Sequence, residues 1–180
     1  MTATVTLHPG PGAGFEEPFE MLEACHQRVL RMLDLTQRLA AHLREAGADA
    51  SAQQAARDVM RYFDLAAPAH HEDEERHVLP RLRQGGRAAL ADRLHADHTQ
   101  MSATWATVRA DLQRVADGTW QLAELDAAVA RWQAMAVHYR AHIEAEESAA
   151  YPAVRDATDA AARRDMGDEM ARRRGQPGLA

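Results

Sequence analysis

The sequence predicts an all-α protein, an up-down-up-down antiparallel four-helix bundle with a short C-terminal fifth helix. First, the 180 residues are 46% hydrophobic but only 5% aromatic, a composition that favours helices over strands. Second, apolar residues recur at spacings of three and four along four long segments. Third, these segments are joined by short connections, as in antiparallel bundles. The length suits one domain with a substantial core.

Glycines and prolines set the expected limits of the helices. The first helix begins at Pro18 and stops near Gly47, and the second ends at the glycine pair of RQGGR, with a local kink expected at Pro68. The sequence DGT breaks the third helix. The five helices are therefore expected at about 18–47, 49–83, 87–116, 120–150 and from Pro152 to about 173.

The two ends of the chain are assigned separately. Residues 1–14 hold two prolines and three glycines and are expected to form an irregular N-terminal arm. Residues 15–172 are assigned to the bundle, made of two repeated helical hairpins plus the C-terminal helix. Residues 173–180 are assigned to a tail.

Charge and cysteine content limit the partners and the compartment. The formal charge is −6, so neither nucleic acid nor an anionic membrane is expected as a partner, and ARRRG at 171–175 is too short to change this. No apolar run approaches the ~20 residues that span a bilayer. Cys25 is the single cysteine, and the N-terminus lacks the pattern of a secretory signal. We therefore expect a cytoplasmic protein.

Two unusually polar stretches repeat each other. HHEDEERHVLP at 70–80 and HIEAEESAAYP at 142–152 both fit H-x-x-x-E-E-x-x-x-x-P. A shift of 72 residues relates the matching positions. The superposed pairs are His26 with His98, His70 with His142, Glu74 with Glu146, Glu75 with Glu147, and Pro80 with Pro152.

The spacing of the four repeated histidines predicts that they lie in one layer. In an antiparallel hairpin, residues equidistant from a turn lie at the same height. The midpoints between successive histidines fall at positions 48, 84 and 120, each at or next to an expected turn. His26, His70, His98 and His142 should therefore meet at one level of the bundle, one from each helix.

Each repeated glutamate follows a histidine by four residues and so shares its helix face. Buried without compensation, such groups would cost several kcal/mol each. Four imidazoles and two carboxylates able to bridge suit a pair of iron ions ~3.5–4 Å apart. The predicted metal ligands are His26, His70, Glu74, His98, His142 and Glu146, and no separate catalytic residue is assigned.

Nearby polar residues are candidates for supporting the ligands. Glu147 and Glu75 lie five residues after a histidine, off the ligand face, although Glu147 could also serve a metal pair directly. His138 could donate a hydrogen bond or act as a fifth imidazole. Glu23 and His95 occupy related places, three residues before His26 and His98. We expect solvent-facing positions for His71, Glu72 and His77.

Two other metal sites are weighed against this one. A ferritin-like diiron site needs two E-x-x-H motifs, but only EACH at 23–26 fits, because HADH occupies the related place. A structural zinc site prefers closed tetrahedral ligation, which six ligands in a two-centre pattern fit poorly.

These residues resemble the hemerythrin-like HHE cation-binding proteins over about residues 15–172, most clearly in YFDLAAPAHHEDEERHVLP. The resemblance implies a hemerythrin-like four-helix bundle around a non-heme pair of iron ions, bridged by both glutamates and an oxo or hydroxo group. Oxygen-carrying hemerythrins have a second histidine four residues away on the third helix. Here those places are Leu94 and Ser102, which is more similar to the iron–sulfur-centre repair proteins of the family.

The resemblance leads to a leading function and two alternatives. Sharing four imidazoles equally leaves a free position on each iron. This favours a protein that binds or reacts with dioxygen, peroxide or nitric oxide, in stress response, sensing or iron-centre maintenance. The first alternative is a metal-dependent regulatory module without turnover, with protein partners on residues 1–14 or on the helix after Pro152. The second is a reversible oxygen binder.

Overall fold

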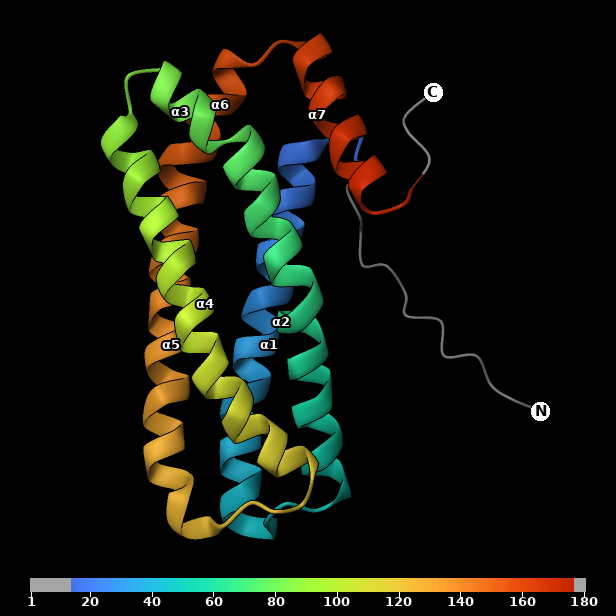
Figure 1. Cartoon of the computed structure of the whole chain (residues 1–180), viewed down its shortest axis with the longest axis vertical. Coiled ribbons are helices and arrows are strands. Elements are labelled where there is room, and N and C mark those ends of the chain that lie inside the picture. Colours follow the sequence, from blue (N-terminus) through green and yellow to red (C-terminus); the bar gives the residue numbers. More distant parts are fainter. Residues whose placement is uncertain (1–13, 177–180) are drawn as a thin grey trace, which may run out of the picture.

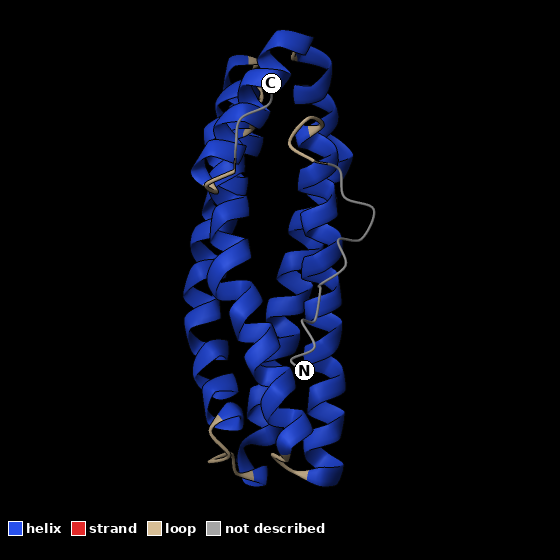
Figure 2. Cartoon of the chain, turned by 90° about the vertical axis from the view of Figure 1, so that its right-hand side faces the viewer, coloured by secondary structure: helices blue, strands red, loops and turns tan. Residues whose placement is uncertain are grey.

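The computed structural model describes residues 14–176, and the expectations for residues 1–13 and 177–180 lie outside this part of the chain. The described residues form helices and connections without a β-strand, which confirms the predicted fold class. Four long helices run up and down beside one another (Figures 1 and 2). They are α1 (Pro18–Ala46), α2 (Ala50–His77), α4 (Ala88–Ala116) and α5 (Leu125–Ala145).

Helix ends coincide with the residues that the sequence suggested. α1 ends at Gly47, whose φ of +69° is easily adopted only without a side chain. Asp49 caps α2 by accepting a 2.8 Å hydrogen bond from the backbone N–H of Ala52. Gly86, with a φ of +75°, lies in the connection to α4. The bounds of the first and third predicted helices are therefore close to those found.

The second, fourth and fifth predicted helices differ from the structure. The second continues through Pro68 and then divides at Val78 into α2 and α3 (Leu79–Gln84). The fourth is preceded by the 3₁₀ turn η1 (Leu122–Glu124), and its α-helical part, α5, ends at Ala145 instead of about residue 150. The predicted fifth helix is divided into two at residues 158–159.

Beyond α5, the chain passes through a π-helical segment, η2 (Glu146–Ala150), into α6 (Tyr151–Ala157). Pro152 lies in the first turn of α6, where its missing N–H is tolerated. The last helix is α7 (Ala160–Arg173).

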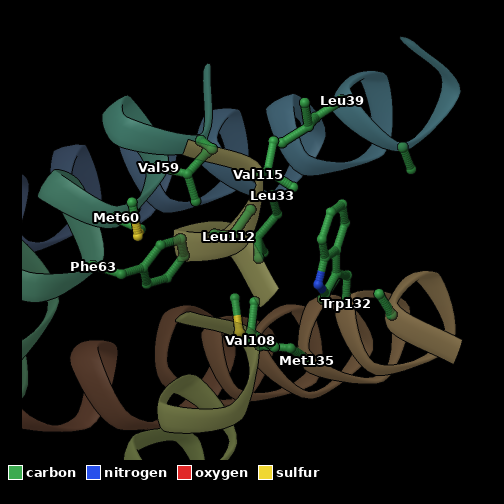
Figure 3. Close-up of a cluster of buried hydrophobic side chains, with 14 of the residues drawn as sticks. Leu33, Leu39, Val59, Met60, Phe63, Val108, Leu112, Val115, Trp132 and Met135 are labelled. Carbon is green, nitrogen blue, oxygen red and sulfur yellow. The ribbon is translucent and has the colours of Figure 1, made fainter. Parts of the chain in front are cut away.

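The apolar core consists of two clusters along the bundle. The larger lies toward the end with the connections 46–50 and 117–121, and includes Phe63, Leu112 and Trp132 (Figure 3). The smaller lies at the opposite end and joins Phe19 and Leu79 of different helices. On α1, His26 falls between Leu22 of the smaller cluster and Val29 of the larger. The polar layer therefore lies between two apolar regions that keep water away from it.

α7 is fastened to α2 by a buried ion-pair cluster (Figure 1 shows α7 beside the upper end of the bundle). Asp73 is fully buried and accepts hydrogen bonds from Arg173 and from Arg174. His77 lies 2.6 Å from Glu169 of α7 with 12% of its side chain exposed, so its predicted solvent-facing position was wrong. Among the described residues, no helix has the length and apolar character needed to cross a membrane.

Candidate metal centre

Six buried side chains from α1, α2, α4, α5 and η2 form two overlapping donor groups. The first group contains His26, His70, Glu74 and Glu146, and the second contains Glu74, His98, His142 and Glu146. Within each group the candidate ligand atoms lie within 4.8 Å of one another. The two groups share both glutamates, so the six residues predicted from the repeat meet in a single cluster.

In the first group, the Nε2 atoms of both imidazoles face carboxylate oxygens. His26 Nε2 lies 3.2 Å from Oε2 of Glu146. His70 Nε2 lies 3.3 Å from Oε1 of Glu74. The two imidazole rings meet edge to face, with their centroids 4.8 Å apart.

In the second group, the Nε2 atoms of both imidazoles face the other oxygen of each carboxylate. His98 Nε2 lies 3.3 Å from Oε2 of Glu74, and His142 Nε2 lies 3.0 Å from Oε1 of Glu146. The Nε2 atoms of His98 and His142 are 3.2 Å apart. Each glutamate therefore directs one oxygen to each histidine pair, an orientation suited to bridging two cations.

The polar atoms of the cluster fit metal ions better than they fit one another. The six residues are at most 4% exposed. Within residues 14–176, Oε2 of Glu74 and both carboxylate oxygens of Glu146 make no hydrogen bond of acceptable geometry. Leaving buried charged acceptors unpaired is costly. Cations bound between nitrogen and oxygen donors would satisfy these atoms.

Without metal, protons on the imidazoles balance the carboxylates. Burial opposes ionisation of His26 and His98, but the carboxylates of Glu146 and Glu74 outweigh it and raise the pKa of each imidazole to about 10. Burial also opposes the charging of Glu74, yet the surrounding imidazoles lower its pKa well below the usual value. Metal ions would take the place of these protons, so metal binding would release protons.

Three acidic residues contact the Nδ1 atoms of candidate ligand imidazoles, on the side of each ring away from the donor groups. Glu147 Oε1 lies 2.9 Å from Nδ1 of His26, and Glu75 Oε1 lies 3.1 Å from Nδ1 of His98. Asp97 Oδ2 lies 3.3 Å from Nδ1 of His142. Such contacts fix the ring orientation and leave Nε2 for the metal.

The remaining candidates lie farther from the ligand atoms. His138 contacts Oδ1 of Asp97 at 3.2 Å and so reaches the ligands through Asp97. His95 contacts Oε1 of Glu75 at 3.2 Å with 56% of its side chain exposed. Glu23 forms an ion pair with Arg155 at 2.7 Å on the outside of the bundle.

His71 does not face solvent as predicted. It is half-buried, and its ring stacks on that of His98 with centroids 4.2 Å apart and planes 10° apart. Its own burial, together with the neighbouring imidazole, lowers the pKa of His71 to about 3. A neutral ring therefore covers one side of the second donor group. Glu72 is exposed as expected and pairs with Arg76.

Sequence reasoning missed two groups that touch the ligands. Asp97 directly precedes His98, so helix periodicity places it off the ligand face, and only the neighbouring helix brings it to His142. Tyr151 is fully buried, and its hydroxyl donates a short hydrogen bond to Oε1 of Glu74. Both contacts depend on the packing between helices, which the spacing of residues along one helix does not reveal.

Comparison with known proteins agrees with this arrangement. The hemerythrin HHE cation binding domain matches residues 17–154. An uncharacterized protein of Haemophilus influenzae is 30% identical over 111 residues, 61% of this chain. The match covers 64% of that relative, which is less than two thirds of its length. This chain therefore belongs to the hemerythrin HHE cation-binding domain family.

Proposed function

We propose that this protein binds two iron ions, one in each donor group, with Glu74 and Glu146 bridging them. The observation that carries the proposal is the sharing of both buried carboxylates between two histidine pairs, each carboxylate with one oxygen toward each pair. Mixed nitrogen and oxygen donors suit iron, whereas a structural zinc site favours four closed ligands and often thiolates. Cys25 is the single cysteine and belongs to the apolar cluster.

We further propose that the iron pair binds or reacts with small oxidants such as dioxygen, peroxide or nitric oxide. A pair of iron ions supplies electrons by cycling between the ferrous and ferric states. The ligands are enclosed between two apolar clusters, so a large substrate would have no room beside them. The proposed setting is stress response, sensing or iron-centre maintenance in the cytoplasm.

The protein keeps the candidate ligand side chains in orientations suited to binding metal. Glu75, Glu147 and Asp97 orient three of the four imidazoles from outside. A surface groove of about 570 Å³ between α1 and α5 is lined by Leu30, Ile143 and Glu147, among others. Because Glu147 also contacts His26, a small molecule in this groove would be separated from the first donor group by that glutamate and its imidazole partner.

Metal analysis combined with Mössbauer spectroscopy tests the iron assignment. Protein purified from iron-replete cells should hold two iron ions per chain, with a spectrum typical of a coupled pair. A Glu74→Gln variant should lose both ions because it removes a shared ligand, while Glu72→Gln on the exposed face should keep them. One metal ion per chain, or zinc in place of iron, would overturn the assignment.

Rapid mixing of the reduced protein with oxidants tests the reaction. We expect ferrous protein to be oxidised by dioxygen, peroxide or nitric oxide faster than free ferrous ions are. A stable adduct that releases dioxygen unchanged would instead identify a reversible carrier. Iron that stays ferrous with all three oxidants would identify a module whose metal serves regulation.

A further inference from the structure

The two donor groups are not equivalent, although the sequence repeat makes their ligands so. The hydroxyl oxygen of Tyr151 lies 3.2 Å from Nε2 of His26, and the same hydroxyl donates to Oε1 of Glu74. Both of those atoms belong to the first donor group. The residue related to Tyr151 by the 72-residue repeat is Leu79, which is buried and apolar. The first group therefore has a phenol beside it, whereas the repeat-related position, which would serve the second group, is occupied by a leucine.

The π-helical segment brings Tyr151 to the ligands. In an α-helix, a residue five positions after Glu146 would lie ~140° away from it around the axis. A π-helix pairs residues five apart, so the residue five positions on returns to the same face. Residues Glu146–Ala150 are π-helical, and the backbone N–H of Tyr151 bonds to the carbonyl of Glu146. The bulge thus places Tyr151 one turn beyond a bridging glutamate.

The ring of Tyr151 is held in position by its neighbours. It stacks on His26, with centroids 5.4 Å apart and planes 7° apart. Phe19 packs against it from the smaller apolar cluster, at a centroid distance of 6.3 Å. These ring contacts direct the hydroxyl toward the first donor group, in addition to its own hydrogen bond to Glu74.

The spacing of the donor atoms is that of neighbouring ligands on one ion. Two donors about 2.1 Å from a metal ion and at right angles to each other are roughly 3 Å apart. The hydroxyl of Tyr151 lies at 3.2 Å from His26 Nε2, and Oε2 of Glu146 lies at the same distance from that nitrogen. The phenol oxygen of Tyr151 therefore lies as far from Nε2 of His26 as Oε2 of Glu146, which is one of the candidate ligand atoms.

We propose that Tyr151 is an additional ligand of the metal ion bound by His26 and His70, through its deprotonated oxygen. The inference rests on the proposed iron site. On binding, the O–H bond breaks, a metal–oxygen bond forms and the proton leaves to solvent, with no change in oxidation state. The first group then offers five donor atoms, while the second offers four. Exchange of a small ligand is accordingly directed to the ion bound by His98 and His142.

Absorption and resonance Raman spectroscopy of the ferric protein test the proposal, because a phenolate bound to ferric iron gives a visible charge-transfer band. We expect this band, and phenolate ring vibrations on excitation within it, in the iron-loaded protein. Tyr151→Phe should lose the band while still binding two iron ions. Tyr139→Phe is the matched control, because Tyr139 is buried and contacts His71, and it should keep the band.

A second measurement covers failure of Tyr151→Phe to fold. The chain has three tyrosines, and ring-deuterated tyrosine in the otherwise unchanged protein should shift the vibrations. If Tyr62→Phe and Tyr139→Phe both keep the band, Tyr151 is assigned by elimination. Two bound iron ions without a visible phenolate band would overturn this inference and leave the proposed iron site intact. Absence of bound iron would overturn both.

Discussion

Glu147 and His26 are 121 residues apart in the chain and are joined by a 2.9 Å contact between Oε1 and Nδ1. The repeat-related contact joins Glu75 to His98 at 3.1 Å. In both cases a carboxylate from one hairpin holds an imidazole of the other. The supporting contacts therefore connect the two hairpins crosswise, in the same layer where the shared glutamates connect them through the ligands.

Replacement of Glu147 tests the importance of this contact. We expect Glu147→Ala to weaken metal binding about 10–100-fold, because the imidazole of His26 loses the group that fixes its orientation. Competition with a chelator of known affinity would measure the change. Glu144→Ala, which removes an exposed carboxylate from the same groove, is the control and should leave the affinity unchanged. Equal losses in both variants would point to the general charge of the groove.

Replacement of His142 tests the coupling of metal to stability. His142→Ala should bind fewer metal ions, and the rise in Tm that metal produces in the unchanged protein should shrink. Thermal unfolding with and without added ferrous iron gives both quantities. His95→Ala removes an exposed imidazole next to the site and should retain the full rise in Tm. Retention of two ions by His142→Ala would contradict its assignment as a ligand.

The metal-free protein should lose stability as the pH rises. The pKa values of His26 and His98 are raised to about 10, well above the ordinary value of 6.5. Their contribution is complete below pH 6.5 and is lost as the pH rises through 10. The raised pKa of His142 acts in the same direction, while the lowered pKa of His70 acts against it. Tm measured between pH 6 and pH 10 should therefore fall in the metal-free protein.

The metal-loaded protein is the control for this pH series, because metal replaces the protons and its Tm should fall less over that range. On the acid side, the lowered pKa values of Glu74 and Glu146 predict a second loss as the pH falls below 4.5. A constant Tm from pH 6 to pH 10 without metal would contradict the expected balance of charges.

The ion pairs between Asp73 and the C-terminal helix should matter for stability. Replacing both Arg173 and Arg174 with alanine leaves the fully buried Asp73 carboxylate without its cations, and we expect a loss of about 3–5 kcal/mol. Chemical denaturation measures it. Arg172→Ala is the matched control, since Arg172 is exposed and bonds to the backbone of Asp168, and should change stability by about 0.5 kcal/mol or less.

The sequence was sufficient to predict the bundle and the meeting of the six candidate ligands in one cluster, because both depend on simple geometry. Turns at the midpoints between His26, His70, His98 and His142 bring the imidazoles to one level, and a spacing of four puts each glutamate beside a histidine. Two copies of the pattern confer a specificity that one charged stretch lacks. The expectation failed for His71 because its neighbour is decided by the packing of α2 against α4 and α5.

Local departures from the α-helix explain most of the other differences. A further helical segment was expected from Pro152 and is found there, but the π-helical turn that joins it to the fourth helix was not expected. The same turn brings Tyr151 to the ligands, and no periodicity of apolar residues reveals it. The expected tail at 173–180 begins with Arg173 and Arg174, whose partner Asp73 is 100 residues earlier in the chain. Contacts over such separations are fixed by the folded chain.

The π-helical turn relates the position of Tyr151 to the number of residues that separate it from Glu146. A π-turn accommodates one more residue than an α-turn. Deleting a single codon, that of Ser148 for instance, would place the tyrosine four residues after Glu146, where a regular α-turn also returns it to the same face. The phenol would then still face the six histidine and glutamate residues. In the gene, the asymmetry of the two donor groups therefore survives the loss of three nucleotides, provided that the π-turn becomes an α-turn.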